Sequence, residues 1–178
     1  VLDALEKWEL YITFFEGSFT EEIKYSCGHE NKKKVPCTVL SVPLYSTLEE
    51  MISFLESKDN VESECDVCKT KRDAEKMMYV TSLPKICIFH LVRFDINGGK
   101  RNDKVDIPFA WNYLRKNGRY ACKAFIVHYG NVRGGHYVSY VCYDNIWYCC
   151  NDQTVTQTVD IAKQLSEAYI IFYALENK

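Results

Sequence analysis

Residues 120–141, YACKAFIVHYGNVRGGHYVSYV, decide the fold, because they place two apolar runs on either side of a glycine-rich turn. Apolar, aromatic and β-branched residues dominate both runs, as is typical of strands. A third run follows Asp144 and Asn145, a pair that favours a two-residue hairpin. The strands predicted here are 119–128, 136–143 and 146–150. The last third of the sequence therefore predicts an antiparallel sheet.

The rest of the sequence predicts further strands and a few helices. Residues 85–94, KICIFHLVRF, are almost continuously apolar, as in a strand covered on both faces. Residues 46–57 are the clearest helix, since Ser46 with Glu49 and Thr47 with Glu50 both offer a capping box. The other predicted elements are a helix within 1–15, a strand at 37–42, a short helix at 160–166 and a strand at 168–174. Strands outnumber helices, which predicts the α+β class.

Length, composition and charge exclude several classes of protein. The 178 residues are 47% hydrophobic, which suffices for the core of one domain, or of one domain with a small appendage. A net charge of -2 provides no field that would attract nucleic acid. No apolar run approaches the ~18 residues of a membrane span. Neither nucleic acid nor a membrane is therefore an expected partner.

Nine cysteines are a high and odd number for a chain of this length. A secreted disulfide scaffold usually has an even number. Several of these cysteines sit inside apolar runs, where a free thiol packs as a small hydrophobe. We therefore expect a reducing compartment, the cytoplasm or the nucleus, with some of the thiols on a metal.

Cys65 and Cys68 form a C-x-x-C pair, which is half of a tetrahedral zinc site. They lie in a segment, 56–76, that carries twelve charged side chains and has little apolar material of its own. A metal would order such a segment, and Cys27 with His29 are the nearest candidates for the other two ligands. Cys37 is a reserve ligand, and the alternative is that the pair are two surface thiols.

His136 follows two glycines at the mouth of the predicted hairpin. Asn151 and Asp152 come fifteen residues later, where either side chain could hold one imidazole nitrogen and fix the tautomer. A histidine held in this way is half of a cysteine-protease site. Taken alone, the four residues GGHY favour a simple hairpin turn over a functional site. Of the other histidines, His90 fits a packed strand residue, and His128 fits either a packing or a functional role.

Together these motifs resemble the ubiquitin-specific proteases, papain-like deubiquitinases built as thumb, fingers and palm. The stretches that carry the resemblance are FFEGSFTEEIKYSCGHE, SVPL, CDVCKTKRDAEKMMYVTSLPKICIFHLVRF, YACKAFIVHYGNVRGGHYVSYV, WYCCNDQTV and AYIIFY. The resemblance implies the fingers and palm of such a domain, mainly antiparallel sheet with zinc-bound fingers. It assigns 1–19 to a helix near the thumb, 20–82 to the fingers and 83–178 to the palm.

By this resemblance His136 is the histidine of the catalytic triad. Asn151 matches the third position of the triad, and Asp152 matches the acidic neighbour that assists it. Gly135 and Tyr137, on either side of the histidine, are expected to contact the tail of the substrate.

The resemblance also implies that the metal is a structural zinc in the fingers. The family has two C-x-x-C pairs, but Lys24 stands where the first pair would begin. Cys27 remains, and His29 becomes the substitute ligand beside Cys65 and Cys68.

The asparagine- and glycine-rich box that holds the nucleophilic cysteine of the family has no match in this sequence. The expected function is therefore thiol-dependent hydrolysis after the C-terminal Gly-Gly of ubiquitin, with the nucleophile outside these 178 residues. The expected partners are ubiquitin, or a ubiquitinated protein, and the missing N-terminal thumb segment. The chain alone would then be inactive.

The alternative is an inactive pseudo-protease module that binds ubiquitin or a partner. A zinc-dependent nucleic-acid binder is disfavoured, because basic residues cluster only at Lys32–Lys34.

Overall fold

The computed structural model describes residues 12–113 and 118–176, which form two compact units. Unit 1 comprises Val1–Thr38 and Ile52–Pro84, and unit 2 comprises Val39–Met51 and Lys85–Lys178. The change of unit at Pro84 lies close to the expected limit between fingers and palm. Residues 39–51, by contrast, lie with unit 2. The reason is that β3 (Val39–Pro43) pairs in parallel with β6 (Ile86–Val92), far along the chain.

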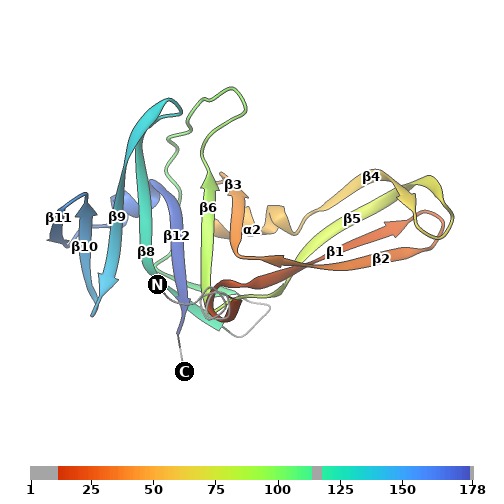
Figure 1. The fold of residues 1–178 in the computed structure, drawn as a ribbon, viewed down its shortest axis with the longest axis horizontal. Helices are drawn as coiled ribbons and strands as arrows, with labels where there is room; N and C mark the ends of the chain where they lie inside the picture. Colours follow the sequence, from red (N-terminus) through yellow and green to blue (C-terminus); the bar gives the residue numbers. More distant parts are fainter. Residues whose placement is uncertain (1–11, 114–117, 177–178) are drawn as a thin grey trace, which may run out of the picture. The chain divides into compact units, whose positions relative to one another are not determined.

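Unit 1 is built on a four-stranded antiparallel sheet in the order β2-β1-β5-β4 (Figure 1). Its strands are β1 (Gly17–Tyr25), β2 (Glu30–Cys37), β4 (Lys58–Cys65) and β5 (Thr70–Ser82). Alternation along the strands buries Phe19, Tyr25, Ala74 and Val80, which lie on one face. The strand predicted at 37–42 is instead interrupted at Thr38, between the end of β2 and the start of β3.

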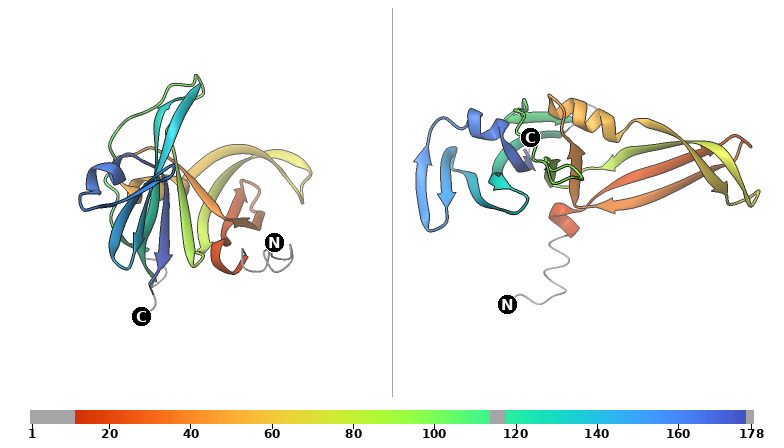
Figure 2. Two further views of the ribbon diagram at one scale, coloured as in Figure 1. Left: turned by 60° about the vertical axis from the view of Figure 1, so that its left-hand side comes forward. Right: turned by 90° about the horizontal axis from the view of Figure 1, so that it is seen from above.

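Unit 2 contains an eight-stranded sheet in the order β11-β10-β9-β8-β12-β6-β3, with β7 paired to β8. Every pair is antiparallel except β3 with β6. Figure 2 shows β8 and β9 running together as a long two-stranded ribbon. The remaining bounds are β7 (Ala110–Tyr113), β8 (Gly118–Asn131), β9 (Gly134–Tyr143), β10 (Ile146–Asn151), β11 (Thr154–Thr158), β12 (Ala168–Leu175) and the helix α3 (Ala162–Ser166).

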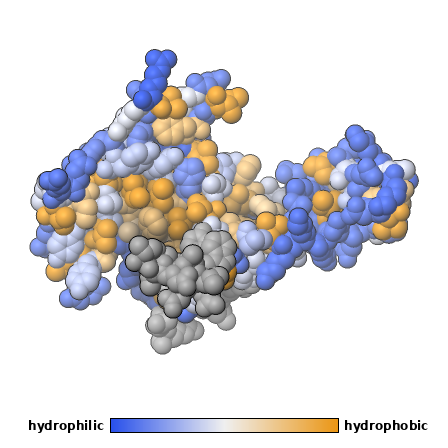
Figure 3. Space-filling view, viewed as in Figure 1, coloured by the Kyte–Doolittle hydropathy of each residue, from blue (hydrophilic) through white to orange (hydrophobic). Residues whose placement is uncertain are grey.

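The core of unit 2 lies on one face of this sheet. Phe89, Phe125 and Tyr173 are fully buried, and the rings of Phe89 and Tyr173 meet edge to face at 5.9 Å. The hydroxyl of Tyr173 donates a hydrogen bond to the carbonyl oxygen of Pro108. β6 buries alternate residues completely and leaves the others partly buried, so the expected full cover of both faces is found on one face only. Figure 3 shows apolar residues gathered over the strands of this unit and mainly hydrophilic residues on the hairpins of unit 1.

The predicted hairpin between β9 and β10 is confirmed. Tyr143 pairs with Ile146 across the turn, and the register continues to Ser139 opposite Cys150. Asp144 and Asn145 have φ angles of 51° and 61°, as a type I′ turn requires. This turn matches the right-handed twist of the strands and so fixes their register.

The helix predicted at 46–57 is α2 (Leu48–Leu55), and only one of the two capping boxes is formed. The Thr47 hydroxyl accepts from the Glu50 amide at 3.2 Å, and the Glu50 carboxylate accepts from the Thr47 amide at 3.2 Å. Of the helix expected within 1–15, residues 12–15 are helical and the rest lie outside the described residues. Within the described parts of the chain, no helix is long and apolar enough to span a membrane.

The capping box gives the first testable prediction. Thr47→Ala removes the acceptor for the Glu50 amide and should lower the free energy of unfolding by about 1 kcal/mol. Ser46→Ala is the matched control, because the Ser46 side chain takes no part in the box that forms. It should change the free energy of unfolding by less than about 0.5 kcal/mol. Denaturant unfolding followed by circular dichroism measures both. Equal losses would show that the wrong box has been assigned.

Candidate catalytic pair and metal cluster

The hairpin of β9 and β10 brings His136 and Asn151 together, as the sequence predicted. The Nε2 atom of His136 and the Oδ1 atom of Asn151 lie 2.5 Å apart. With the amide oxygen as acceptor, the imidazole donates from Nε2–H, so its neutral form has the lone pair on Nδ1. Nδ1 is then the atom that could accept a proton from a reacting group.

Asp152, the other residue expected to orient His136, lies just after the end of β10. It lies in the two-residue turn between β10 and β11, with a left-handed φ of 50°, and its side chain is exposed. Among the described side chains, only Asn151 makes a hydrogen bond to the His136 imidazole.

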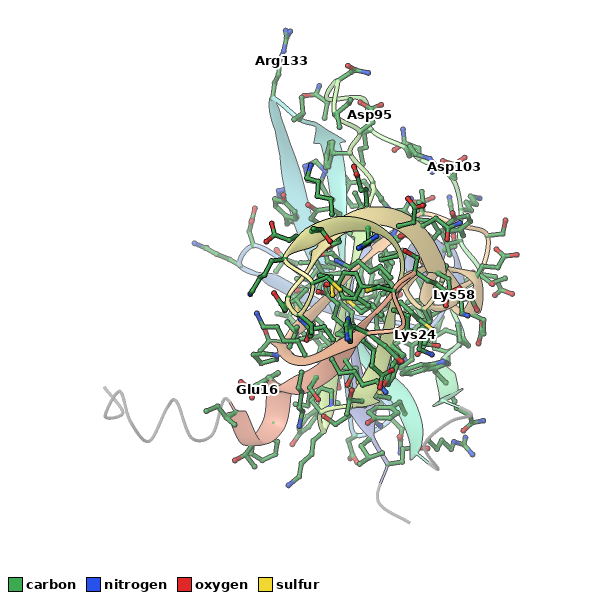
Figure 4. The ribbon with its side chains drawn as sticks, turned by 90° about the vertical axis from the view of Figure 1, so that its right-hand side faces the viewer. Glu16, Lys24, Lys58, Asp95, Asp103 and Arg133 are labelled. Atoms are coloured by element: carbon green, nitrogen blue, oxygen red, sulfur yellow. The ribbon has the colours of Figure 1, made fainter. Side chains whose placement is uncertain are left out.

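The two glycines before His136 have unequal roles. A Cβ atom on Gly135 would lie 2.2 Å from Nε2 of His128 and 2.4 Å from the carbonyl oxygen of Tyr129. A Cβ atom on Gly134 would meet nothing within 4 Å. Glycine is therefore required at position 135 by the packing of the protein itself. Figure 4 shows Arg133, just before them at the tip of the β8–β9 turn, pointing away from the ribbon.

His128 is a packed residue, which settles the alternative that the sequence left open. Only 6% of it is exposed, and its ring lies 5.6 Å from that of Phe94 and 4.6 Å from that of Tyr137. The ammonium group of Lys100 donates to its backbone carbonyl oxygen. Burial lowers the pKa of His128, and the positive charge of Lys100 lowers it further. His128 is thus a neutral ring under the glycine turn. Tyr137, by contrast, is 55% exposed beside the candidate site.

In unit 1, the two predicted pairs of metal ligands meet at the ends of two hairpins. Cys27 and His29 lie in the turn between β1 and β2, closed by the Tyr25 amide donating to the His29 carbonyl at 2.9 Å. Cys65 and Cys68 lie at the turn between β4 and β5. Their four ligand atoms all lie within 4.8 Å of one another. Cys37 is not part of this cluster.

The distances in this cluster fit a tetrahedral metal site. Nδ1 of His29 lies 3.5, 3.5 and 3.4 Å from the sulfur atoms of Cys27, Cys65 and Cys68. The sulfur atoms of Cys27 and Cys65 lie 3.7 Å apart. Tetrahedral bonds of about 2.3 Å to sulfur and about 2.1 Å to nitrogen require separations of about 3.5 Å between nitrogen and sulfur and about 3.8 Å between sulfurs. The three thiols and the imidazole could therefore hold a metal ion.

The charge state of the thiols points the same way. The backbone amide of Cys68 donates to the Cys65 sulfur and lowers the pKa of Cys65 to about 6. The pKa of Cys68 is raised, first by its hydrogen bond with Cys27 and also by the neighbouring negative charge. The cluster thus accommodates one thiolate readily and resists a second, a conflict that a cation would remove.

In the sheet of unit 2, no thiol lies beside His136 in the strand register. None of the nine cysteines forms a disulfide, and Cys122 is buried with a pKa raised to about 12. Cys149 shares a face with Asn151 but pairs with Tyr140, four residues from His136 along β9, which is about 13 Å. Cys150 points to the opposite face.

The unequal glycines give the second prediction. Gly135→Ala should lower the free energy of unfolding by about 2 kcal/mol, because the new methyl group overlaps His128 and a backbone oxygen. It should also displace His136 from Asn151, which is visible as loss of the Nε2–H signal in nitrogen NMR. Gly134→Ala is the control and should leave both readouts unchanged. A stable Gly135→Ala chain with an intact signal would contradict the packing described above.

Solved structures share this fold. The SAGA DUB module of Ubp8, Sgf11, Sus1 and Sgf73 bound to monoubiquitin matches 93% of this chain and 41% of that chain, with a TM-score of 0.79 and 24% identity. A second structure of a SAGA Ubp8 module matches with a TM-score of 0.82 over 93% of this chain, also at 24% identity. The fold is therefore the α+β fold of ubiquitin-specific proteases, as predicted.

Curated relatives and a family model identify the family. A probable ubiquitin carboxyl-terminal hydrolase 4 of Schizosaccharomyces pombe is 28% identical over 83% of this chain and 30% of its own length. Ubiquitin carboxyl-terminal hydrolase 25 of Arabidopsis thaliana is 31% identical over 92% of this chain and 28% of its own length. The chain thus spans about a third of the length of these relatives. The family model for ubiquitin carboxyl-terminal hydrolase matches residues 4–173. The chain therefore belongs to the ubiquitin carboxyl-terminal hydrolase family.

Proposed function

We propose that this chain supplies the general base and its orienting amide to a deubiquitinase that cleaves after the C-terminal Gly-Gly of ubiquitin. The observation that carries the proposal is the hydrogen bond between His136 and Asn151, within a chain of the ubiquitin carboxyl-terminal hydrolase family. A histidine oriented by an amide is the arrangement that activates a thiol in cysteine proteases.

In the proposed mechanism, Nδ1 of His136 takes the proton of a cysteine thiol and holds the thiolate as an ion pair. The sulfur attacks the carbonyl carbon of the last ubiquitin glycine, and the imidazolium returns the proton to the leaving amine. Water then hydrolyses the thioester, with His136 again as base. Asn151 keeps Nδ1 directed at the reacting atoms by accepting from Nε2–H. Asp152 is proposed to assist Asn151 in orienting the His136 imidazole.

The nucleophile is proposed to lie outside these 178 residues. Two observations support this: the thiols nearest in sequence to Asn151 are out of reach of His136, and the chain spans about a third of its relatives. The N-terminal segment that would carry the cysteine is therefore a proposed partner.

Ubiquitin, or a ubiquitinated protein, is the proposed substrate. One structural neighbour is a module bound to monoubiquitin, and another is a module bound to ubiquitin aldehyde. In this chain Tyr137 is exposed directly after His136, which suits it to contact the substrate tail. Gly135 is proposed to line the same path through its backbone.

A structural zinc ion is proposed for the cluster of Cys27, His29, Cys65 and Cys68. Three soft thiolates and one imidazole favour zinc over magnesium or calcium. Four protein ligands would leave no position for a reactive water, so the ion would order the ends of the hairpins. A reducing compartment, cytoplasm or nucleus, is proposed because none of the nine cysteines forms a disulfide.

A second candidate function is an inactive module that binds ubiquitin or a partner protein. It is favoured by one observation, the lack of a thiol beside His136 among the described residues of unit 2. A pure binding module has no need of the His136–Asn151 hydrogen bond, and for that reason we place this function second.

The metal proposal gives the third prediction. Elemental analysis should find about one zinc ion per chain, and a chelator should unfold the hairpin ends. At a chelator concentration that leaves zinc bound to the unchanged chain, Cys68→Ser should lose its zinc. Cys37→Ser is the matched control, since this thiol lies outside the cluster. Full zinc occupancy in Cys68→Ser, or loss in Cys37→Ser, would refute the ligand set.

The activity proposal gives the fourth prediction. The chain alone should not cleave a ubiquitin C-terminal reporter, and adding the nucleophile-bearing N-terminal segment, fused or in trans, should restore turnover. In the restored enzyme, His136→Ala should reduce kcat/KM by about 10³-fold or more. Asn151→Ala should reduce it less, because Asp152 remains nearby. Unaltered ubiquitin binding without turnover in the restored protein would support the binding module instead. Turnover by the chain alone would identify a nucleophile among its nine cysteines.

A further inference from the structure

The outermost strand of unit 2, β11, has one side of its backbone without a partner. It pairs only with β10, and Figure 1 shows it as the last strand of the sheet. No strand lies against its outer side among residues 12–113 and 118–176. Thr154 to Gln157 are all exposed. β11 is thus an accessible sheet edge.

The register shows which backbone groups of β11 point outward. Asn151 and Thr154 close a two-residue turn, and such a closing pair exchanges both of its backbone hydrogen bonds. Starting from Thr154, residues whose backbone groups bond to β10 then alternate along β11 with residues whose backbone groups point outward. The N–H and C=O groups of Val155 and Gln157 therefore face away from β10 and are available to another strand.

The outer strands β2, β4 and β3 carry features that discourage pairing with another strand, and β11 does not. β2 has three lysines, Lys32–Lys34, followed by Pro36, and β4 has Lys58, Asp59, Glu62 and Glu64. β3 ends in a proline and buries alternate side chains. Residues 153–159, QTVTQTV, contain no charge and no proline, and most of them are β-branched. Lysine, proline and charge are the usual protection of an edge, so an edge without them suits strand addition.

Charges at the two ends of β11 select the kind of partner. Asp152 precedes the strand and Asp160 follows it. A second copy of this chain, paired antiparallel about Thr156, would bring Asp152 of one copy close to Asp160 of the other at both ends of the strand pair, and like charges brought together in this way destabilise the pairing. A partner strand with a basic residue at each end would instead meet a carboxylate at both positions.

The side chains of β11 define the pattern between those basic residues. Thr154, Thr156 and Thr158 lie on one face, where hydroxyl-bearing partners form favourable pairs. Val155 lies on the other face, beside Cys150 in β10, and is 61% exposed. An apolar residue on that face of the partner strand would cover Val155.

We propose that β11 binds an extended segment of a partner protein by strand addition. The segment has about seven uncharged residues, alternating hydroxyl-bearing and apolar side chains, between two arginine or lysine residues. This proposal is independent of the proposed deubiquitinase activity, because it concerns binding at the sheet edge alone.

The test uses the 178-residue chain and the peptide Arg-Val-Thr-Val-Ser-Val-Thr-Val-Arg, with a control peptide in which both arginines are replaced by glutamate. Titration followed by amide NMR should give shifts centred on β10 and β11, and hydrogen exchange at Val155 and Gln157 should slow. The glutamate peptide should bind at least about 10-fold more weakly, since two favourable end charges become unfavourable. Equal binding of the two peptides would overturn the charge argument.

Substitutions at Gln157 test the backbone contact. Gln157→Pro removes an outward N–H without touching an inward bond, so it should weaken the arginine peptide at least about 10-fold. Gln157→Ala is the matched control and should change binding less than about 2-fold. Gln157→Lys keeps the backbone N–H and adds a positive charge, which would repel the arginine peptide. Weaker binding by this variant would locate the peptide at β11 even if the proline variant disturbs the strand. Retained binding in both Pro and Lys variants, or peptide shifts located elsewhere, would overturn the proposal. Sedimentation that shows a dimer through β11 would also overturn it.

Discussion

The register between β9 and β10 is the constraint on which the candidate catalytic pair depends. Successive side chains of a strand point to opposite faces, so a slip of one residue would turn Asn151 away from His136. The left-handed turn at Asp144 and Asn145 excludes such a slip, because it joins the strands with a loop of fixed length and twist. The pairing of β9 with β8 adds a second constraint, since Gly135 lies directly against His128. His136 is thus held from both neighbouring strands, by backbone geometry more than by its own side-chain contacts.

Unit 1 has a different source of order. Its sheet has one apolar face, and toward the hairpin ends the buried cluster reduces to Tyr25, Cys65 and Ala74, with a few partly buried neighbours such as Ile23 and Val61. Such a cluster buries little area, which is why ligands at the ends of both hairpins matter. Four of the six separations between the ligand atoms match those of a tetrahedral site. The two units therefore differ in what is available to order their sheets: unit 2 has a packed core, and the hairpin ends of unit 1 have a small cluster with side chains that could hold a metal.

Local sequence patterns predicted the elements that are determined by residues close together in the sequence. The hairpin turn, the helix α2 with one of its two capping boxes, and the metal cluster all follow from short-range spacing. The strands that were not predicted are short or highly charged and are stabilised by neighbours distant in sequence; they are β1, β2, β4, β5, β7 and β11. The parallel pairing of β3 with β6 has the same origin. Gly135 shows the limit most clearly: the resemblance implied a contact with the substrate tail, and only the structure shows that the ring of His128 excludes a side chain there.

The edge strand β11 and the catalytic pair share a physical connection. Asn151 is the last residue of β10 and is bonded through its backbone to Thr154, the first residue of β11. The backbone that holds the Asn151 amide oxygen toward His136 is therefore held in turn by a short edge strand with mostly exposed side chains. Short, exposed edges open more readily than central strands. His136, which comes from β9, is fixed within the sheet. Asn151, which comes from β10, is only as ordered as this edge strand. Any strand that pairs with β11 would thus also restrain Asn151, through two successive ladders of backbone hydrogen bonds and without contact with the imidazole.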